Sequence, residues 1–129
     1  MDARSVQSLE GVHPALAAVA HLAWAGLPTM DGLTFVVTEG LRSQERQAQL
    51  VKSGASRTMH SKHVVGKAFD IAAVLDGKIS WEFSLYQRLA GELLAAAKEL
   101  SVNLVWGGSW ASFKDGVHFE LDDPVYNHA

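Results

Sequence analysis

The chain contains no cysteine among its 129 residues. Disulfide bonds therefore do not stabilise the fold, and any zinc site has to be built from histidine and carboxylate side chains. The absence of cysteine is compatible with folding in a reducing cytoplasm and with activity outside the cell.

The chain also lacks a run of basic residues and a long apolar run. Its 11 Lys and Arg residues are scattered, and the formal net charge of −3 predicts no nucleic-acid partner. The most apolar stretch, residues 14–27, contains His21 and is shorter than the roughly 20 apolar residues that cross a bilayer. The first residues do not combine a basic segment with an apolar core, so we expect neither a signal peptide nor membrane insertion.

Length and composition indicate a small globular protein. We expect one domain, residues 1–129, that buries roughly two-thirds of the surface exposed by the unfolded chain. Hydrophobic residues make up 48% of the chain and charged residues 19%, which is ordinary for such a domain.

Three segments have the periodicity of helices. Apolar residues recur at helical spacing from Pro14 until Gly26. Ser43 suits the N-cap of a second helix, and Gly54 suits its C-terminal end. We expect Ser80 to cap a long third helix. Its apolar stripe comprises Phe83, Tyr86, Leu89, Ala90, Leu93, Leu94, Ala97 and Leu100.

Four segments favour β-strands because they are rich in β-branched, aromatic or alternating apolar residues. They cover residues 33–38, 67–74, 104–106 and 116–121. The period of two places Asp70 on one face of its strand, opposite Phe69, and puts His118 and Glu120 together on one face of the last strand. Helices combined with a small, mainly antiparallel sheet make an α+β fold.

Two histidines and a carboxylate give the strongest chemical signal. They lie in the segments Ser61-Lys-His63-Val-Val-Gly66-Lys-Ala-Phe-Asp70 and Asp115-Gly-Val-His118-Phe-Glu120. Neighbouring strands lie about 4.8 Å apart, so Asp70 and His118 can converge on one ion while His63 enters from the preceding loop. Zinc hydrolases commonly combine three protein ligands with an open position for water and a nearby base, for which Asp115 is available.

These two segments resemble motifs of the zinc L-alanyl–D-glutamate endopeptidases of phage endolysins, which belong with the D-alanyl-D-alanine carboxypeptidases and vancomycin-resistance dipeptidases. The resemblance spans about residues 12–121. It includes the further motifs Val12-His13-Pro14, Gly40-Leu-Arg42-Ser43-x-Glu45-Arg46-Gln47 and Trp106-Gly-Gly-x-Trp110. The pattern departs at Ser109, where this branch usually has an acidic residue.

The resemblance implies a LAS-type, hedgehog-like zinc peptidase fold with one zinc ion per chain. The zinc ligands would be His63, Asp70 and His118, and Asp115 would be the general base. The net positive charge left on such a site lowers the pKa of bound water from 15.7 toward about 7. Asp115 would take the proton of that water and pass it to the leaving amine.

The residues implied to contact substrate have alternative roles. Arg42 can hold a substrate carboxylate or a developing oxyanion, or it can be a structural cation. Ser61 is implied as a substrate contact, but its hydroxyl also suits a hydrogen bond to the loop backbone. Trp110 is assigned to the substrate site, although it and Trp106 equally suit a pocket wall or the core. Glu120 is a candidate partner that orients a histidine.

The remaining histidines are expected to be mostly ordinary polar residues. His13 suits a cap at a helix start, His21 lies within the helix, and His128 lies in the tail. His60 neighbours the site but lies outside the ligand spacing, so its role stays open.

The favoured function is hydrolysis of the L-alanyl–D-glutamate bond in the peptidoglycan stem peptide, which lyses the cell wall. A D-alanyl-D-alanine carboxypeptidase or dipeptidase and a non-catalytic zinc module remain as alternatives. Asp115 argues against the module, because a structural site needs no base. We expect a monomeric catalytic domain without a separate cell-wall-binding domain, made in the host bacterial cytoplasm and released to the wall through a holin.

Overall fold

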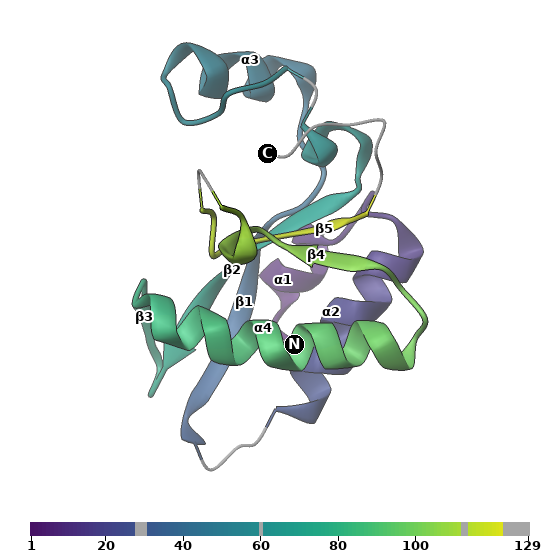
Figure 1. Cartoon of the computed structure of the whole chain (residues 1–129), viewed down its shortest axis with the longest axis vertical. Coiled ribbons are helices and arrows are strands. Elements are labelled where there is room, and N and C mark those ends of the chain that lie inside the picture. Colours follow the sequence, from purple (N-terminus) through teal and green to yellow (C-terminus); the bar gives the residue numbers. More distant parts are fainter. Residues whose placement is uncertain (28–30, 60, 112–113, 123–129) are drawn as a thin grey trace.

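The computed structural model describes residues 1–27, 31–59, 61–111 and 114–122. Figure 1 shows helices packed around a small twisted sheet, with short 3₁₀ turns between some elements. In chain order the elements are α1 (Ala3–Ser8), α2 (Pro14–Gly26), β1 (Leu33–Glu39), α3 (Gln44–Lys52), the 3₁₀ turn η2 (Lys62–Val65), β2 (Ala68–Leu75), β3 (Lys78–Ser80), α4 (Phe83–Glu99), β4 (Leu104–Trp106), the 3₁₀ turn η3 (Gly107–Ser109) and β5 (His118–Leu121). The predicted α+β class is confirmed.

The strands form a sheet in the order β1-β2-β5-β4, and the short β3 also pairs with β2. All pairs among the described residues are antiparallel, as predicted. Asp70 on β2 lies directly opposite His118 on β5. Asp76 and Gly77 form the predicted turn, from which the chain returns along β2 as β3.

One face of the sheet carries the hydrophobic core. Phe35, Phe69 and Phe119, from three different strands, are at most 1% exposed. The helices α2 and α4 pack over these residues and on each other, and α4 crosses the strands in Figure 1. Because Asp70 alternates with Phe69 and Ile71 along β2, its side chain lies on the opposite face, as predicted.

The predicted starts of two helices are confirmed. The ring Nδ1 of His13 caps α2 by accepting a hydrogen bond from the backbone N–H of Ala15. The hydroxyl of Ser43 caps α3 by accepting from the backbone N–H of Arg46. Both side chains accept hydrogen bonds from N–H groups that have no partner inside the helix.

The sequence did not predict α1, which lies against the free edge of β1. Ser5 is fully buried there, and its Oγ accepts a hydrogen bond of 2.9 Å from the backbone N–H of Val37. With only six residues, α1 is too short for a helical period to be recognised in the sequence.

The prediction for the start and apolar face of α4 is partly wrong. Ser80 ends β3, and Glu82 is the N-cap of α4, because β3 pairs with β2 instead of entering the helix. Leu94 and Leu100 are each 40% exposed, whereas Leu93 is buried. Successive helical residues point about 100° apart, so Leu94 cannot share the buried face of Leu93.

Two further differences concern residues near the site. Phe83, also predicted for the core, is 40% exposed and stacks on Trp106 at a centroid distance of 5.6 Å. The last strand begins at His118, later than predicted, because residues 116–117 form a turn.

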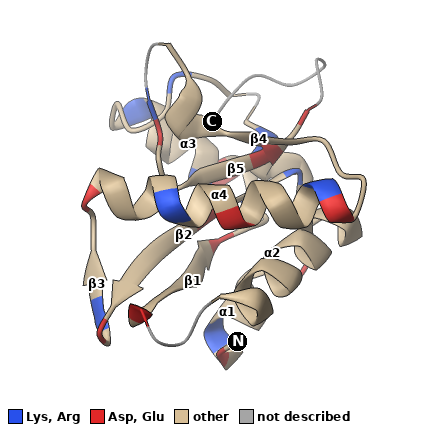
Figure 2. Cartoon of the chain, turned by 60° about the horizontal axis from the view of Figure 1, so that its bottom comes forward, with Lys and Arg blue, Asp and Glu red and all other residues tan. Residues whose placement is uncertain are grey.

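Figure 2 shows charged residues of both signs interspersed along the ribbon, including along α4. Within the part of the chain that the structure describes, no helix is long and apolar enough to cross a bilayer.

Candidate metal centre

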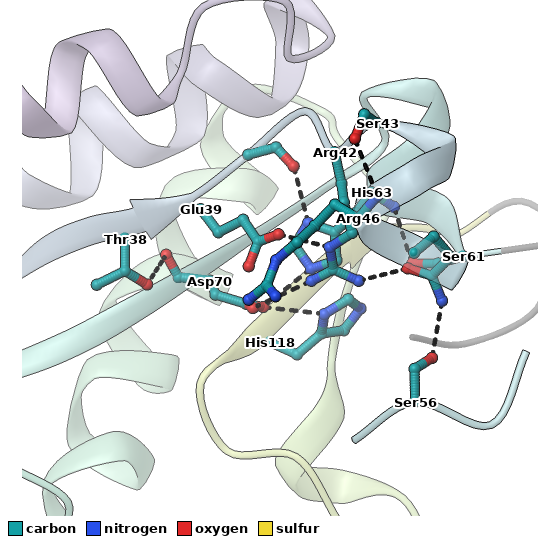
Figure 3. Close-up of polar contacts among 12 residues, drawn as sticks. Thr38, Glu39, Arg42, Ser43, Arg46, Ser56, Ser61, His63, Asp70 and His118 are labelled. Carbon is teal, nitrogen blue, oxygen red and sulfur yellow. Dashed lines mark hydrogen bonds and ion pairs between the residues drawn. The ribbon is translucent and has the colours of Figure 1, made fainter. Parts of the chain in front are cut away.

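His63, Asp70 and His118 come together on the polar face of the sheet. Asp70 Oδ1 lies 3.1 Å from Nδ1 of His118, its cross-strand neighbour. His63 enters from η2, and its Nε2 lies 3.1 Å from the same oxygen. One ligand atom from each residue lies within 4.8 Å of the others, and Figure 3 shows the three side chains pointing toward one another. The three predicted ligands therefore form a group that can hold a metal ion.

The η2 turn carries His63 into the interior. Ser61 Oγ starts the turn by accepting a hydrogen bond from the backbone N–H of His63. Gly66 ends it with a φ of 71°, and a Cβ there would lie 2.4 Å from the carbonyl oxygen of Gly11. Both the left-handed backbone and the close contact require glycine, so the predicted reversal at Gly66 is confirmed.

Each histidine ring has a fixed partner on the side away from Asp70. Nδ1 of His63 lies 2.8 Å from the carbonyl oxygen of Gly40, which can only accept a hydrogen bond. Nε2 of His118 lies 2.8 Å from Oε1 of Glu120. Neutral rings therefore carry their hydrogens on these two nitrogens and present their lone pairs to Asp70. Glu120 is the histidine partner that the sequence indicated.

Glu120 is itself held by a buried cation. It is fully buried, and its Oε2 lies 2.5 Å from Nζ of Lys62, which is 2% exposed. Burial would raise the pKa of Glu120, but the hydrogen bonds from His118 and Lys62 hold that pKa below its ordinary value. Glu120 is therefore an ionised acceptor for the ring of His118.

A cation is needed where these groups meet, because two nitrogen lone pairs and a carboxylate oxygen face one another. Burial opposes a charged His118 ring, but hydrogen bonds to Asp70 and Glu120 outweigh burial and raise the pKa of His118 to about 9. Burial would raise the pKa of Asp70, but the neighbouring rings of His63 and His118 hold that pKa well below its ordinary value. Two imidazole nitrogens and one carboxylate oxygen are a donor set that fits zinc.

Asp115 lies in the turn that leads into β5. Its carbonyl oxygen accepts a hydrogen bond from the N–H of His118, and its own N–H donates to the carbonyl oxygen of Gly107. A Cβ at residue 107 would lie 2.4 Å from the carbonyl oxygen of Asp115, so this close packing requires glycine. Burial, followed by the charge of Asp70, raises the pKa of Asp115. A carboxyl group with a raised pKa beside a candidate metal centre suits a general base.

Arg42 presents one fixed donor to the same site. Its Nε donates to Glu39 Oε1 at 2.5 Å, and its Nη1 donates to Gln47 Oε1 at 2.7 Å. The remaining Nη2 lies 3.9 Å from Asp70 Oδ2 (Figure 3). Gln47 is fully buried and donates to Ser56 Oγ at 2.8 Å, so Arg42 is anchored to α3 and the loop after it.

The other two predicted site residues have different surroundings. Ser61 is 0% exposed, and its hydroxyl has the backbone role that the sequence left open. Trp110 is partly exposed, and its ring centroid lies 5.4 Å from that of His118, so it forms a wall of the site. Trp106 donates its ring N–H to the carbonyl oxygen of Gly116, which supports the turn. Contact of Ser61 or Trp110 with substrate stays a prediction.

Two of the remaining histidines lie on or next to α2. His13 is the α2 cap described above, and His21 is exposed on α2. His60 and His128 lie outside the described residues.

Three polar residues that support the site were not predicted from the sequence. Lys62 holds Glu120, while Glu39 and Gln47 hold Arg42. Two of them lie within the recognised motifs. Lys62 stands between Ser61 and His63, and Gln47 is the last residue of the motif that begins at Gly40. Their contacts depend on tertiary structure, which the pattern alone does not define.

The chain is similar to known proteins over most of its length. The sequence model of the family described as phage L-alanyl-D-glutamate peptidase matches residues 1–126. The L-alanyl-D-glutamate peptidase of Listeria phage A118 is 35% identical over 96 residues, or 74% of this chain and 33% of that protein. The peptidoglycan L-alanyl-D-glutamate endopeptidase CwlK of Bacillus subtilis (strain 168) is 34% identical over 105 residues, or 70% of this chain and 62% of that protein. The chain thus spans about a third and about three-fifths of the lengths of these two relatives.

A solved structure is similar over nearly the whole chain. The crystal structure of the L-Ala D-Glu endopeptidase ChiX of Serratia marcescens matches with a TM-score of 0.84 and 41% sequence identity. The match covers 94% of this chain and 88% of that one. The predicted LAS-type fold is confirmed by this likeness.

Proposed function

The chain belongs to the phage L-alanyl-D-glutamate peptidase family, and from that premise we propose that it is a zinc-dependent endopeptidase. Its substrate is the peptidoglycan stem peptide, which it hydrolyses between L-alanine and D-glutamate to lyse the bacterial cell wall. The curated names of the relatives and of the structural neighbour support this bond as the substrate.

The observation that carries the proposal is the convergence of His63 Nε2, Asp70 Oδ1 and His118 Nδ1. This donor set fits one zinc ion per chain, and three protein ligands leave room for water, as in catalytic rather than structural zinc sites. Asp115, beside the group, supplies the base that a structural site does not need.

The chain's own groups then divide the work of hydrolysis. Zinc, when bound, supplies a Lewis acid that polarises the carbonyl and makes water acidic. Asp115 takes the proton from the attacking water and gives it to the nitrogen of the leaving amine. Arg42, fixed by Glu39 and Gln47, offers Nη2 to the developing oxyanion or to a carboxylate of the substrate.

Substrate is bound against the wall formed by Trp110, and Ser61 is a further candidate contact through its hydroxyl hydrogen. Both relatives are named for the same bond, one from a phage and the other from a bacterium. We also propose that the chain acts as a monomeric catalytic domain. A host bacterial cytoplasm is its proposed site of synthesis, and a holin its proposed route to the wall.

Digestion of purified peptidoglycan tests the proposal. Mass spectrometry of the products should find new L-alanine carboxyl termini and new D-glutamate amino termini. Release of free D-alanine instead would indicate the carboxypeptidase alternative. An absence of any new terminus from the zinc-loaded protein would indicate a non-catalytic module.

A further inference from the structure

Lys62 is a buried ammonium group with two partners on one strand. Its Nζ donates to Oε2 of Glu120 at 2.5 Å and to the backbone carbonyl oxygen of Leu121 at 2.7 Å. The side chains of Lys62 and Glu120 are 2% and 0% exposed. The mechanism above uses neither charge in a chemical step.

Fold stability is a weak explanation for such a pair. Taking two charges out of water offsets most of their attraction, and apolar residues of similar volume often replace a buried ion pair without loss. The two oxygens of Glu120 have separate tasks, since Oε1 accepts from Nε2 of His118 while Oε2 accepts from Lys62. The contacts therefore run from Lys62 through Glu120 to the ring of His118, which faces Asp70.

We infer that Lys62 is a positioning residue for the metal centre. Lys62 donates a hydrogen bond to Oε2 of Glu120 and so fixes the carboxylate. The carboxylate in turn fixes the ring of His118 with Nε2–H toward Glu120 and Nδ1 toward the metal. The inference rests on the proposed zinc site and assigns a residue that sets its metal affinity.

The position of Lys62 in the chain strengthens this assignment. It directly precedes His63 in η2, whereas its partners lie at the end of β5. One residue thus connects the segment that supplies the first ligand to the strand that supplies the last. Partners that orient metal-bound histidines commonly set metal affinity and activity by about 10–100-fold.

The test compares the metal affinity of Lys62→Met and Lys62→Arg with that of the wild-type protein. Zinc affinity is measured by competition with a chromophoric chelator, and ligand geometry by the visible absorption bands of the cobalt(II) form. We expect Lys62→Met to bind zinc about 10–100-fold more weakly and to change the cobalt bands. Lys62→Arg keeps a cation that can reach Glu120, so it should restore most of the affinity.

Two further variants separate positioning from folding. The double variant Lys62→Met with Glu120→Gln removes both charges, so it keeps the test valid if Lys62→Met alone does not fold. It should retain native far-UV circular dichroism and still bind zinc more weakly than wild type. Leu93→Ala removes a buried core side chain on α4 and should lower thermal stability without changing zinc affinity.

Two outcomes would overturn the inference. One is wild-type zinc affinity and cobalt bands in Lys62→Met or, if that variant does not fold, in the double variant. The other is a loss of zinc affinity in Leu93→Ala that equals the loss in Lys62→Met when the two variants have the same thermal stability. Failure of the wild-type protein to bind zinc would instead refute the proposed function, so the two failures are distinguishable.

Discussion

Asp70 and His118 are cross-strand neighbours, and the register that pairs them is held by the core on the other face of the sheet. The next pair in the same register, Phe69 and Phe119, stacks at 5.6 Å beneath the helices. A slip of one residue would turn every side chain of the strand to the opposite face. Core packing and the geometry of the candidate metal centre therefore require the same strand alignment.

Removal of a histidine ligand should remove the metal. His63→Ala and His118→Ala each leave only two of the three protein ligands, so we expect purified protein without zinc and without lytic activity. Elemental analysis and the clearing of a peptidoglycan suspension measure the two effects. His21→Ala changes an exposed histidine on α2 and serves as the control. Full zinc occupancy in both ligand variants would contradict the ligand assignment.

Removal of the metal from the wild-type chain should stop activity and leave the fold intact. The core lies on the face of the sheet away from the metal centre, so folding does not depend on zinc as it does in a zinc finger. After treatment with a chelator, far-UV circular dichroism at room temperature should stay native, and added zinc should restore hydrolysis. Wholesale unfolding on chelation would show that the metal is structural.

Asp115→Asn should impair chemistry while leaving metal binding intact. Asparagine has nearly the same size as aspartate but cannot accept the proton of water. General-base catalysis typically contributes 10²–10⁴-fold, so we expect kcat to fall by about that factor with zinc still bound. Release of stem-peptide fragments at the wild-type rate would refute the proposed base.

Asp70→Asn is the matched comparison for that variant. Asp70 lies 3.1 Å from both ligand nitrogens, so loss of its charge should weaken zinc binding itself. Zinc affinity and kcat at saturating zinc, measured for both variants, separate the two roles. If the two phenotypes were exchanged, Asp115 would be the ligand and Asp70 the base.

Arg42→Lys should lower activity although the charge is retained. Lysine cannot reproduce the planar fork that contacts Glu39 and Gln47 while pointing a third donor at the site. A lost hydrogen bond to a charged group corresponds to about tenfold or more in kcat/KM. Kinetics on a defined stem-peptide substrate, with zinc content measured in parallel, tests this. Unchanged kcat/KM would indicate that Arg42 is only a structural cation.

Zinc affinity should increase with pH in the neutral range. In the metal-free protein the pKa of His118 is raised to about 9, so zinc has to displace a proton from the ring. As pH rises toward that value, fewer rings are protonated, and the apparent affinity should rise by about tenfold per pH unit before it levels off. Chelator competition at several pH values below the pKa measures the slope. A flat profile would show that no proton is displaced.

The sequence predicted those features whose signals are local. Pro14 and Ser43 mark helix starts that the structure confirms, and the period of two correctly placed Asp70 away from the core. The three candidate ligands were recognisable from their two motifs and from the resemblance of these motifs to the peptidase family. Two of the ligands lie on strands with a fixed alternation, and His63 precedes a required glycine.

Features that depend on distant partners were not predictable. Lys62 and Glu120 are 58 residues apart, so the local sequence around either residue does not indicate their contact. The strand β3 exists because β2 offers it an edge, and this pairing displaced the expected cap at Ser80. Arg42 was recognised as a cation near the site, but the anchor provided by Gln47 depends on how α3 folds back.

The short helix α1 also bears on how copies of this chain behave toward one another. An end strand with unpaired backbone groups is a template on which a second molecule can add a strand and begin to aggregate. Here β1 is an end strand, and the hydroxyl of Ser5 already occupies the backbone N–H of Val37. Deletion of the first eight residues would uncover that edge, so this helix protects the protein from self-association at high concentration.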